Sequence, residues 1–353
     1  MRKNLIFTGL ILLGVLMMSV IYINVNSKEN NFNKKDNKVV LAEDKKVFEE
    51  NINNLSAWVA YWDLNSDREI KTLDMELKNI CYFAVNFNST NELVMPENLI
   101  DYYNKTKSYD YNKYITIVND KINSDGSSIL KDRNLLKSLF NNSDLRSTHI
   151  QEIINLAVKY DFDGIEIDYE QIKNDMKLWD DYILFINELY QKAERKGLKV
   201  RVILEPNIPF EKLSFAKGPT YVIMCYNLHG GFSEPGEKAN PKFIRELMEK
   251  TSKIPGKKDF AIATGGFNWA SSGKNTSLSE TEANRILKEY GSKAERDDES
   301  QCLFFNYTDE KNIEHEVWYA DKITLESWMK VIIEKGYDIS IWRLGGNLFE
   351  YDN

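Results

Sequence analysis

The sequence predicts an α/β protein, a (β/α)8 TIM barrel with a small α+β insertion before the last strand. Two observations support this expectation. Short runs rich in β-branched and aromatic residues alternate with longer runs of helical periodicity, an order typical of parallel sheets. About eight such units fit into roughly 300 residues, which favours a closed barrel over an open, doubly wound sheet.

The N-terminal 26 residues are expected to form a signal or transmembrane anchor. Two basic residues precede an uncharged apolar stretch from Leu5 to Ile23, about long enough to cross a bilayer as a helix. No convincing small-residue cleavage site follows it, which favours an uncleaved anchor over a removed signal peptide. Residues 27–54 are mostly polar and charged and are expected to form a linker. We therefore expect a single-pass protein of the cell membrane with its folded part outside, or a secreted protein if the signal is cleaved.

Eight strands are expected within the folded part, residues 55–353. Each is a short apolar or alternating run with many β-branched or aromatic residues. In chain order they are residues 57–62, 79–87, 113–118, 164–170, 199–205, 221–226, 259–264 and 338–342.

Helices are expected between several of these strands because apolar residues recur there with helical spacing. A Ser-Thr pair opens the second helix ahead of its apolar-periodic run, and Lys-Gly pairs close the third and the last, as is typical of helix termini. The predicted helices are residues 132–140, 147–160, 175–196, 241–251 and 324–335.

The stretch of about 271–320 is too long for an ordinary connection between a strand and a helix. It contains a predicted helix at 279–290 and an extended run at 302–307. We therefore expect a small insertion over one rim of the barrel.

Composition excludes several classes of function. The chain has 46 Lys and Arg against 54 Asp and Glu, a net charge of −8, so it lacks the basic character of nucleic-acid-binding proteins. Its three cysteines, Cys81, Cys225 and Cys302, show no paired spacing, and none of its three histidines has a His or Cys neighbour at metal-ligand spacing. We expect buried free thiols, no nucleic-acid partner, no metal and no cofactor.

The segment at 161–170 carries the clearest chemical information. In a strand, Glu166, Asp168 and Glu170 would share one face, while the opposite face is apolar. The C-terminal end of a barrel strand is where catalytic groups lie. Neighbouring carboxylates cannot all ionise cheaply, so the pKa of the outermost is expected to rise, as a general acid for glycosidic bond cleavage requires. A solvated edge strand and an all-oxygen site for a divalent metal remain alternative interpretations.

The chain contains the segments DGIEIDYE, MCYN, VWYAD and IWRLGG, which together resemble glycoside hydrolase family 18. DGIEIDYE at 163–170 is similar to its DGxDxDxE signature, and MCYN at 224–227 is similar to its Met-x-Tyr-Asp motif. VWYAD at 317–321 and IWRLGG at 341–346 resemble the branch of bacterial spore and cell-wall hydrolases, the N-acetylglucosaminidase branch. The resemblance covers about 55–350, nearly all of the folded part.

The resemblance implies roles for three catalytic residues. Glu170 would protonate the glycosidic oxygen, and the substrate's own acetamido carbonyl would then attack the anomeric carbon. Asp168 would bind the acetamido N–H, and Tyr226 would donate its hydroxyl to the acetamido oxygen.

Five further residues are expected to bind substrate. Trp342 would form an apolar floor beneath the sugar, although it and Tyr226 are equally compatible with core packing. Glu166 and Asn227 replace the commoner Asp of the family. The full set is Glu166, Asn227, Trp342, Tyr61 and Trp318. Five aromatic side chains either extend the sugar-binding cleft or simply pack, namely Trp58, Trp62, Trp269, Trp318 and Tyr319.

The resemblance thus implies a bacterial, retaining hydrolase of β-1,4 bonds in N-acetylglucosamine-containing polysaccharides. A membrane anchor would hold the barrel near cell-wall or spore-cortex peptidoglycan, so this substrate is favoured over chitin. The expected partners are the polysaccharide and, through the N-terminal helix, the membrane. The alternative is a catalytically weak or silent, lectin-like barrel that binds the same glycans.

Overall fold

The computed structural model describes residues 54–73 and 77–349. The expected anchor lies outside the described residues, as does the expected linker except for its last residue. No helix in the described ranges is long and apolar enough to span a membrane.

Eight parallel strands form a closed barrel, which confirms the predicted fold. Pairing between neighbours runs in the order β2-β1-β15-β9-β8-β7-β6-β4, and β2 also pairs with β4 to close the ring. Short strands β3 (Leu93–Val94) and β5 (Ser128–Ile129) extend β2 and β4 in antiparallel fashion. The barrel strands are β1 (Leu55–Ala60), β2 (Leu77–Phe87), β4 (Asn112–Ile122), β6 (Gly164–Asp168), β7 (Lys199–Leu204), β8 (Thr220–Met224), β9 (Lys258–Ala263) and β15 (Asp338–Trp342).

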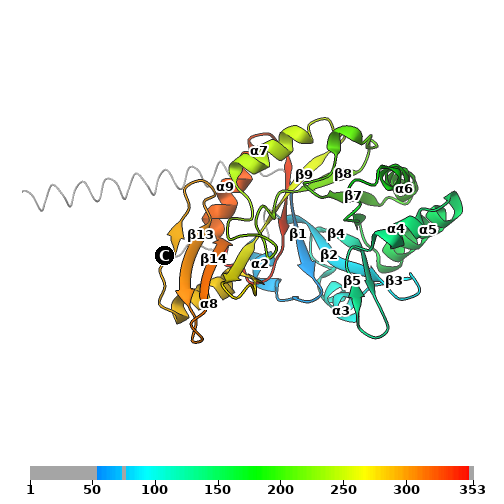
Figure 1. Ribbon diagram of the computed structural model, residues 1–353. Coiled ribbons are helices and arrows are strands. Elements are labelled where there is room, and N and C mark those ends of the chain that lie inside the picture. Colours follow the sequence, from blue (N-terminus) through cyan, green and yellow to red (C-terminus); the bar gives the residue numbers. More distant parts are fainter. Residues whose placement is uncertain (1–53, 74–76, 350–353) are drawn as a thin grey trace, which may run out of the picture. The chain divides into compact units, whose positions relative to one another are not determined.

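Helices surround the barrel, and all five predicted ones are present (Figure 1). Two others, α2 and α3, were not predicted, because α2 is too short to show a helical period and α3 starts at Glu97 without a side-chain cap. Between β7 and β8 the chain makes only the 3₁₀ turn Phe210–Lys212. The helices around the barrel are α2 (Asp67–Thr72), α3 (Glu97–Thr106), α4 (Arg133–Leu139), α5 (Ser143–Tyr160), α6 (Met176–Glu194), α7 (Pro241–Lys250) and α9 (Lys322–Ile333).

The ends of helix α5 are set by local sequence, and its C-terminal end determines where strand β6 begins. It begins earlier than predicted because the side chain of Asn142 accepts hydrogen bonds from the N–H groups of Asp144 and Leu145. It ends at Asp161, which adopts the left-handed conformation with φ 61°. The chain then turns directly into β6, the strand that carries the carboxylates.

A small antiparallel sheet follows β9 and lies on the side of the barrel away from α4–α6 (Figure 1). It starts at Gly265, earlier than the expected insertion. A Cβ on Gly266 would lie 1.8 Å from the carbonyl oxygen of Trp318, so only glycine permits this strand pairing. Helix α8 (Glu280–Glu289) covers one face of the sheet. Its strands are β10 (Gly265–Ala270), β11 (Thr276–Leu278), β12 (Glu295–Arg296), β13 (Leu303–Thr308) and β14 (Glu314–Ala320).

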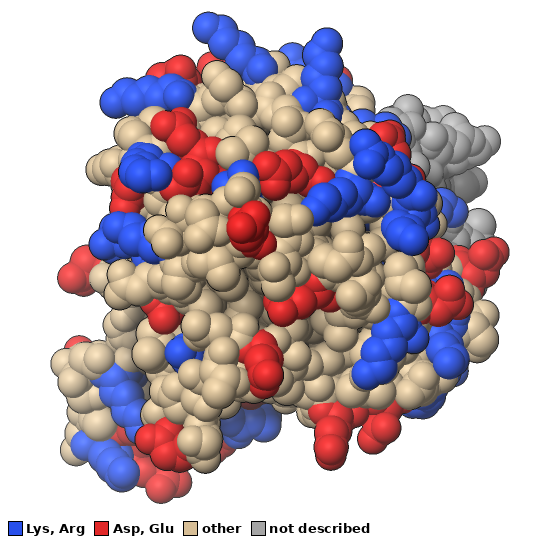
Figure 2. Space-filling view, turned by 90° about the vertical axis from the view of Figure 1, so that its right-hand side faces the viewer, with Lys and Arg blue, Asp and Glu red and all other residues tan. Residues whose placement is uncertain are grey.

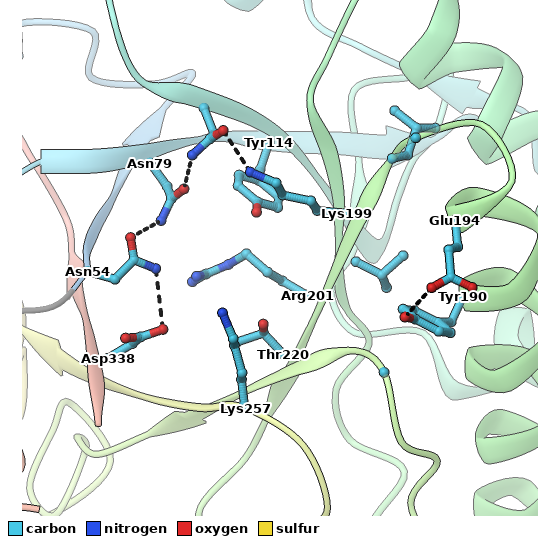
Figure 3. A pocket seen from close by; sticks show the side chains of 15 residues that line it. Asn54, Asn79, Tyr114, Tyr190, Glu194, Lys199, Arg201, Thr220, Lys257 and Asp338 are labelled. Carbon is cyan, nitrogen blue, oxygen red and sulfur yellow. Dashed lines mark hydrogen bonds between the residues drawn. The ribbon is translucent and has the colours of Figure 1, made fainter. Parts of the chain in front are cut away.

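Hydrogen-bonded amides close the barrel at the amino-terminal ends of its strands. Lys199 Nζ donates to Asn112 (2.8 Å), Asn112 to Asn79 (2.9 Å) and Asn79 to Asn54 (3.1 Å). Asn54 then donates to Asp338 at 3.3 Å, so the chain of bonds joins four barrel strands (Figure 3). These residues line a cavity of about 670 Å³. Because each amide already has a protein partner, the network serves to close the barrel.

One surface of the molecule mixes charges of both signs. Figure 2 shows acidic and basic side chains interspersed over the face seen there. Such mixing provides no basic stripe along which a phosphate backbone would be held.

A buried arginine, Arg201 on β7, organises the barrel interior. Its Nε donates to Glu166 Oε2 at 2.8 Å, and Nη1 donates to Asp259 Oδ2 at 3.0 Å. The guanidinium also lies 5.5 Å from the ring centre of Tyr114 and 5.9 Å from that of Trp58. One fixed cation therefore neutralises two buried carboxylates contributed by β6 and β9.

Replacing Arg201 by Met is expected to lower the free energy of unfolding by about 3–5 kcal/mol, because it leaves two buried carboxylates without their cation. Even with Arg201 present, burial raises the pKa of Asp259 to about 6. Urea denaturation measures the loss. Lys242→Met, on the exposed side of α7, is the matched control. An Arg201→Met protein as stable as this control would show that the ion pairs contribute no stability.

Candidate active site

The carboxylate strand ends sooner than predicted. β6 stops at Asp168, so Tyr169 and Glu170 lie just beyond it at the mouth of the barrel. Tyr169 points to the apolar side, where its hydroxyl lies 2.7 Å from His149 Nε2 and the two rings stack. The alternation inferred from the sequence therefore persists past the end of the strand.

Glu166 lies in the barrel interior, completely buried. Its Oε1 accepts hydrogen bonds from Trp58 Nε1 (2.5 Å) and Thr116 Oγ1 (2.8 Å), and its Oε2 accepts from Arg201. Both oxygens are thus occupied by protein donors. The sequence interpretation placed Glu166 among the substrate-binding residues. Its geometry instead suits a residue that supports Asp168, the next residue on the same face of the strand.

Asp168 is also buried, but its Oδ1 has no hydrogen-bond partner among the described residues. Burial raises the pKa of Asp168 well above its usual range, and the charge of Glu170 acts in the same direction. A buried acceptor without a partner is costly. The site therefore offers a vacant acceptor suited to an N–H or O–H group of a ligand.

The Glu170 side chain is only 13% exposed and forms an ion pair with Lys131 Nζ. Burial raises its pKa, the neighbouring Lys131 opposes this rise, and the charges of Glu205 and Asp120 reinforce it. The sequence interpretation missed Lys131. It lies on the loop between β5 and α4, and no periodicity or spacing connects it with β6.

The backbone of Glu170 is fixed by a buried asparagine. Asn119, on β4, accepts from the Glu170 N–H at 3.0 Å and donates to the Glu170 carbonyl oxygen at 3.1 Å. The next residue, Gln171, has φ 62° and donates its N–H to Glu205 at 2.8 Å. The turn after β6 is therefore held on both sides, which aims the Glu170 carboxyl at the mouth.

Tyr226 follows β8, and Trp342 ends β15. Tyr226 is buried, and the charges of Asp168 and Glu170 add to burial in raising its pKa, so the three groups lie within electrostatic reach of one another. Trp342 is partly buried, with its ring edge-on to Phe83 at 4.8 Å. Tyr226 belongs to a buried hydrophobic cluster of the barrel strands, and Trp342 packs against that cluster.

A cavity of about 720 Å³ opens where the barrel meets the small sheet. Three of the predicted site residues line it, namely Tyr226, Asn227 and Trp342. Asn227 is exposed and has φ 68°. Trp62, a half-exposed aromatic, also lines the cavity. A flat aromatic wall with a few polar groups is the surface that a sugar ring requires.

Tyr61 and Trp318 do not line this cavity. The Tyr61 ring packs edge-on to Trp62 at 5.0 Å. Trp318 stacks on Phe304 at 4.7 Å and donates its indole N–H to Glu316. Within the part of the chain that the structure describes, both predicted substrate-binding residues thus have protein neighbours.

A divalent-metal site was one of two alternative interpretations of the carboxylates. The other, a solvated edge strand, is wrong because β6 pairs with β4 on one side and β7 on the other. In ranges 54–73 and 77–349, no group of three or more His, Cys, Asp or Glu residues is arranged to hold a metal ion. Glu166 and Glu170 instead form ion pairs with Arg201 and Lys131, two cations of the protein itself.

Replacing Lys131 by Met is expected to shift the alkaline limb of the kcat/KM profile to higher pH, because the nearby positive charge lowers the pKa of Glu170. A general acid works only while protonated, so a higher pKa extends activity toward alkaline pH. Rates on a soluble glycan from pH 4 to 9 provide the measurement. An unchanged alkaline limb would mean that Lys131 no longer contacts Glu170 when the glycosidic bond is cleaved.

The chain is similar in sequence to known proteins. Residues 57–347 match the family model described as "Glycosyl hydrolases family 18". The chain is 25% identical over 232 residues to an uncharacterized glycosylase, YvbX, of Bacillus subtilis, covering 61% of this chain and 66% of the relative. It is 25% identical over 233 residues to a cortical fragment-lytic enzyme of the same organism, covering 59% and 52%. The chain thus spans between half and two thirds of the length of these relatives.

Solved structures share the fold. The spore cortex-lytic enzyme SleL of Bacillus cereus superposes with a TM-score of 0.70 at 18% identity, covering 84% of this chain and 72% of that one. A chitinase of Chromobacterium violaceum gives a TM-score of 0.69 at 17% identity, covering 83% and 95%. At these identities the likeness shows the fold alone, and the chemistry has to be argued from the site.

Proposed function

Since the chain belongs to the glycosyl hydrolases of family 18, we propose that it is a glycosidase that cleaves β-1,4 bonds in glycans containing N-acetylglucosamine. One observation carries the proposal. An acid whose pKa is raised by burial, Glu170, a buried carboxyl oxygen of Asp168 without a protein partner, and a tyrosine, Tyr226, lie within electrostatic reach of one another at the barrel mouth.

Glu170 acts as the acid. Burial keeps its carboxyl protonated at a higher pH than a free Glu, so it is able to donate the proton to the glycosidic oxygen as the bond breaks. The same group, then ionised, takes a proton from the water that completes hydrolysis. Asn119 holds the backbone of Glu170 so that both steps use one carboxyl position.

Asp168 and Tyr226 orient the substrate's acetamido group. The free Oδ1 of Asp168 accepts the acetamido N–H, which turns the acetamido carbonyl toward the anomeric carbon. The carbonyl oxygen forms a bond to that carbon as the leaving sugar departs, giving an oxazolinium ring. Water opens this ring, so the product retains the β configuration. Tyr226 donates its hydroxyl to the acetamido oxygen.

Two residues that line the cavity beside Tyr226 hold the sugar, whereas Glu166, Asp168 and Glu170 do not line it. Trp342 lies beneath the pyranose, whose C–H face packs on its ring. Asn227, exposed in the same cavity, hydrogen-bonds a sugar hydroxyl. Glu166, held by Trp58 and Arg201, supports Asp168 from below.

We propose peptidoglycan of the cell wall or spore cortex as the preferred substrate over chitin. The relatives named as cortical fragment-lytic enzymes support this choice, as does the apolar N-terminal stretch from Leu5 to Ile23. That stretch would anchor the chain in the bacterial membrane with the barrel outside. Because a chitinase has the same fold, chitin is the substrate with which peptidoglycan should be compared.

A lectin-like barrel that binds these glycans without cleaving them is the second candidate. The Lys131–Glu170 ion pair favours it, because an acid held ionised cannot donate a proton. Incubating the full chain with purified peptidoglycan, and separately with chitin oligomers, decides between the two. New N-acetylglucosamine reducing ends are expected, in greater amount from peptidoglycan. Binding without release would establish the lectin.

A further inference from the structure

The sugar cavity contains a lysine without a counter-ion. Lys238, on the loop between β8 and α7, lines the cavity together with Tyr226 and Trp342. Its Nζ donates to the carbonyl oxygen of Thr264 at 2.7 Å and lies 5.1 Å from the ring centre of Phe267. No ion pair of Lys238 is found within ranges 54–73 and 77–349.

The loop that carries Lys238 is folded back on itself. The N–H of Leu228 donates to the Lys238 carbonyl oxygen at 2.9 Å, and the N–H of His229 donates to the Glu237 carbonyl oxygen at 3.2 Å. Asn240 then begins α7 by accepting a hydrogen bond from the Phe243 N–H. An ordered turn therefore positions the ammonium group of Lys238 in the cavity.

The other charged groups in the cavity are already engaged. Arg343 forms an ion pair with Asp63 at 2.9 Å. Glu282 accepts hydrogen bonds from the N–H and hydroxyl of Ser279 at 2.7 and 2.8 Å. Among the described residues that line the cavity, Lys238 alone has a positive charge that no carboxylate balances.

Burial disfavours this charge. It lowers the pKa of Lys238 to about 8, and the positive charge of Arg343 acts in the same direction. A desolvated cation without an anion is unfavourable, and a ligand that supplies a negative charge removes the penalty. Because the cavity is where Trp342 and Tyr226 meet the glycan, the anion has to be carried by the glycan.

We propose that Lys238 is a specificity-determining residue that binds a carboxylate substituent of the glycan. This inference rests on the proposed function, since it assigns the substrate class of the same cavity. A muramic residue that carries no peptide has a lactyl group at O3 that ends in a free carboxylate, whereas every N-acetylglucosamine of a chitin chain is neutral. Lys238 therefore selects a carboxylated glycan over chitin.

The test measures binding in a background that cannot turn over, Glu170→Gln, in the full chain. Isothermal titration compares peptidoglycan glycan strands freed of their peptides with the same strands after their lactyl carboxyls are converted to methylamides. The carboxylated strands are expected to bind about tenfold more tightly, as a hydrogen bond to a charged group implies. Adding Lys238→Met should abolish the difference, Lys238→Arg should restore it, and Lys242→Met should leave it unchanged.

The inference would be overturned by equal affinity for both strands, or by a tenfold preference that survives Lys238→Met. An equal loss of affinity for both strands in Lys238→Met would also overturn it, because the lysine would then only support the cavity. The proposed function is judged separately by product release from the unmodified chain. Absence of release would refute the hydrolase without affecting the comparison of affinities.

Discussion

Replacing Glu170 by Gln is expected to reduce kcat by about 10³-fold or more, with little change in glycan affinity. Glutamine has nearly the same shape but no proton of suitable acidity, so the leaving sugar has to depart without protonation. Gln is also unable to keep the ion pair with Lys131. Reducing ends released from a soluble N-acetylglucosamine oligomer measure the rate, and isothermal titration measures the affinity.

Lys242→Met is the control for this prediction, because it changes a charge on the outer helix α7 without touching the cavity. A Glu170→Gln protein that retains more than about a tenth of the normal rate would show that another group protonates the leaving oxygen. A protein that no longer binds glycan would show instead that the substitution disturbs the cavity.

Replacing Asp168 by Asn is expected to reduce kcat by about 10²–10³-fold, the effect of losing one group aimed at developing charge. The amide still accepts a hydrogen bond, but it has no negative charge to stabilise the positive charge of the cyclic intermediate. It also removes the carboxyl that interacts electrostatically with Glu170. The acid limb of the pH profile, which reports the carboxylate form of Asp168, should disappear.

A stable mimic of the cyclic intermediate separates this role from simple packing. N-acetylglucosamine thiazoline has the fused ring that the acetamido attack would form. Its affinity should fall at least about tenfold in Asp168→Asn, while that of a plain N-acetylglucosamine dimer changes less. An equal loss for both ligands would assign Asp168 to general substrate binding.

The barrel and the acidic face are predictable from the sequence because both depend on local periodicity. The alternation in 163–170 is enough to place Glu166, Asp168 and Glu170 on one side of a strand, and the tryptophan of IWRLGG falls at the end of the last strand. Such patterns are visible in the sequence because successive residues of one strand alternate between the two faces of the sheet.

The groups that tune the site are not evident from the sequence because they depend on long-range geometry. Lys131 and Lys238 lie on loops, and their neighbours come from other elements of the chain. Arg201 is different, since a single charged residue inside the apolar strand KVRVIL is a signal of a buried ion pair. For Tyr61 and Trp318 the sequence offers only aromatic character, which does not separate a sugar platform from packing.

The stereochemistry of the product tests the proposed mechanism most directly. Substrate assistance at Asp168 and acid catalysis at Glu170 together require that the β configuration is retained. The full chain is mixed with a soluble peptidoglycan strand or N-acetylglucosamine oligomer inside an NMR tube, and the anomeric protons of the first products are recorded before mutarotation. We expect the β anomer to appear first. Initial formation of the α anomer would contradict the mechanism, because a water molecule would then have attacked the anomeric carbon directly.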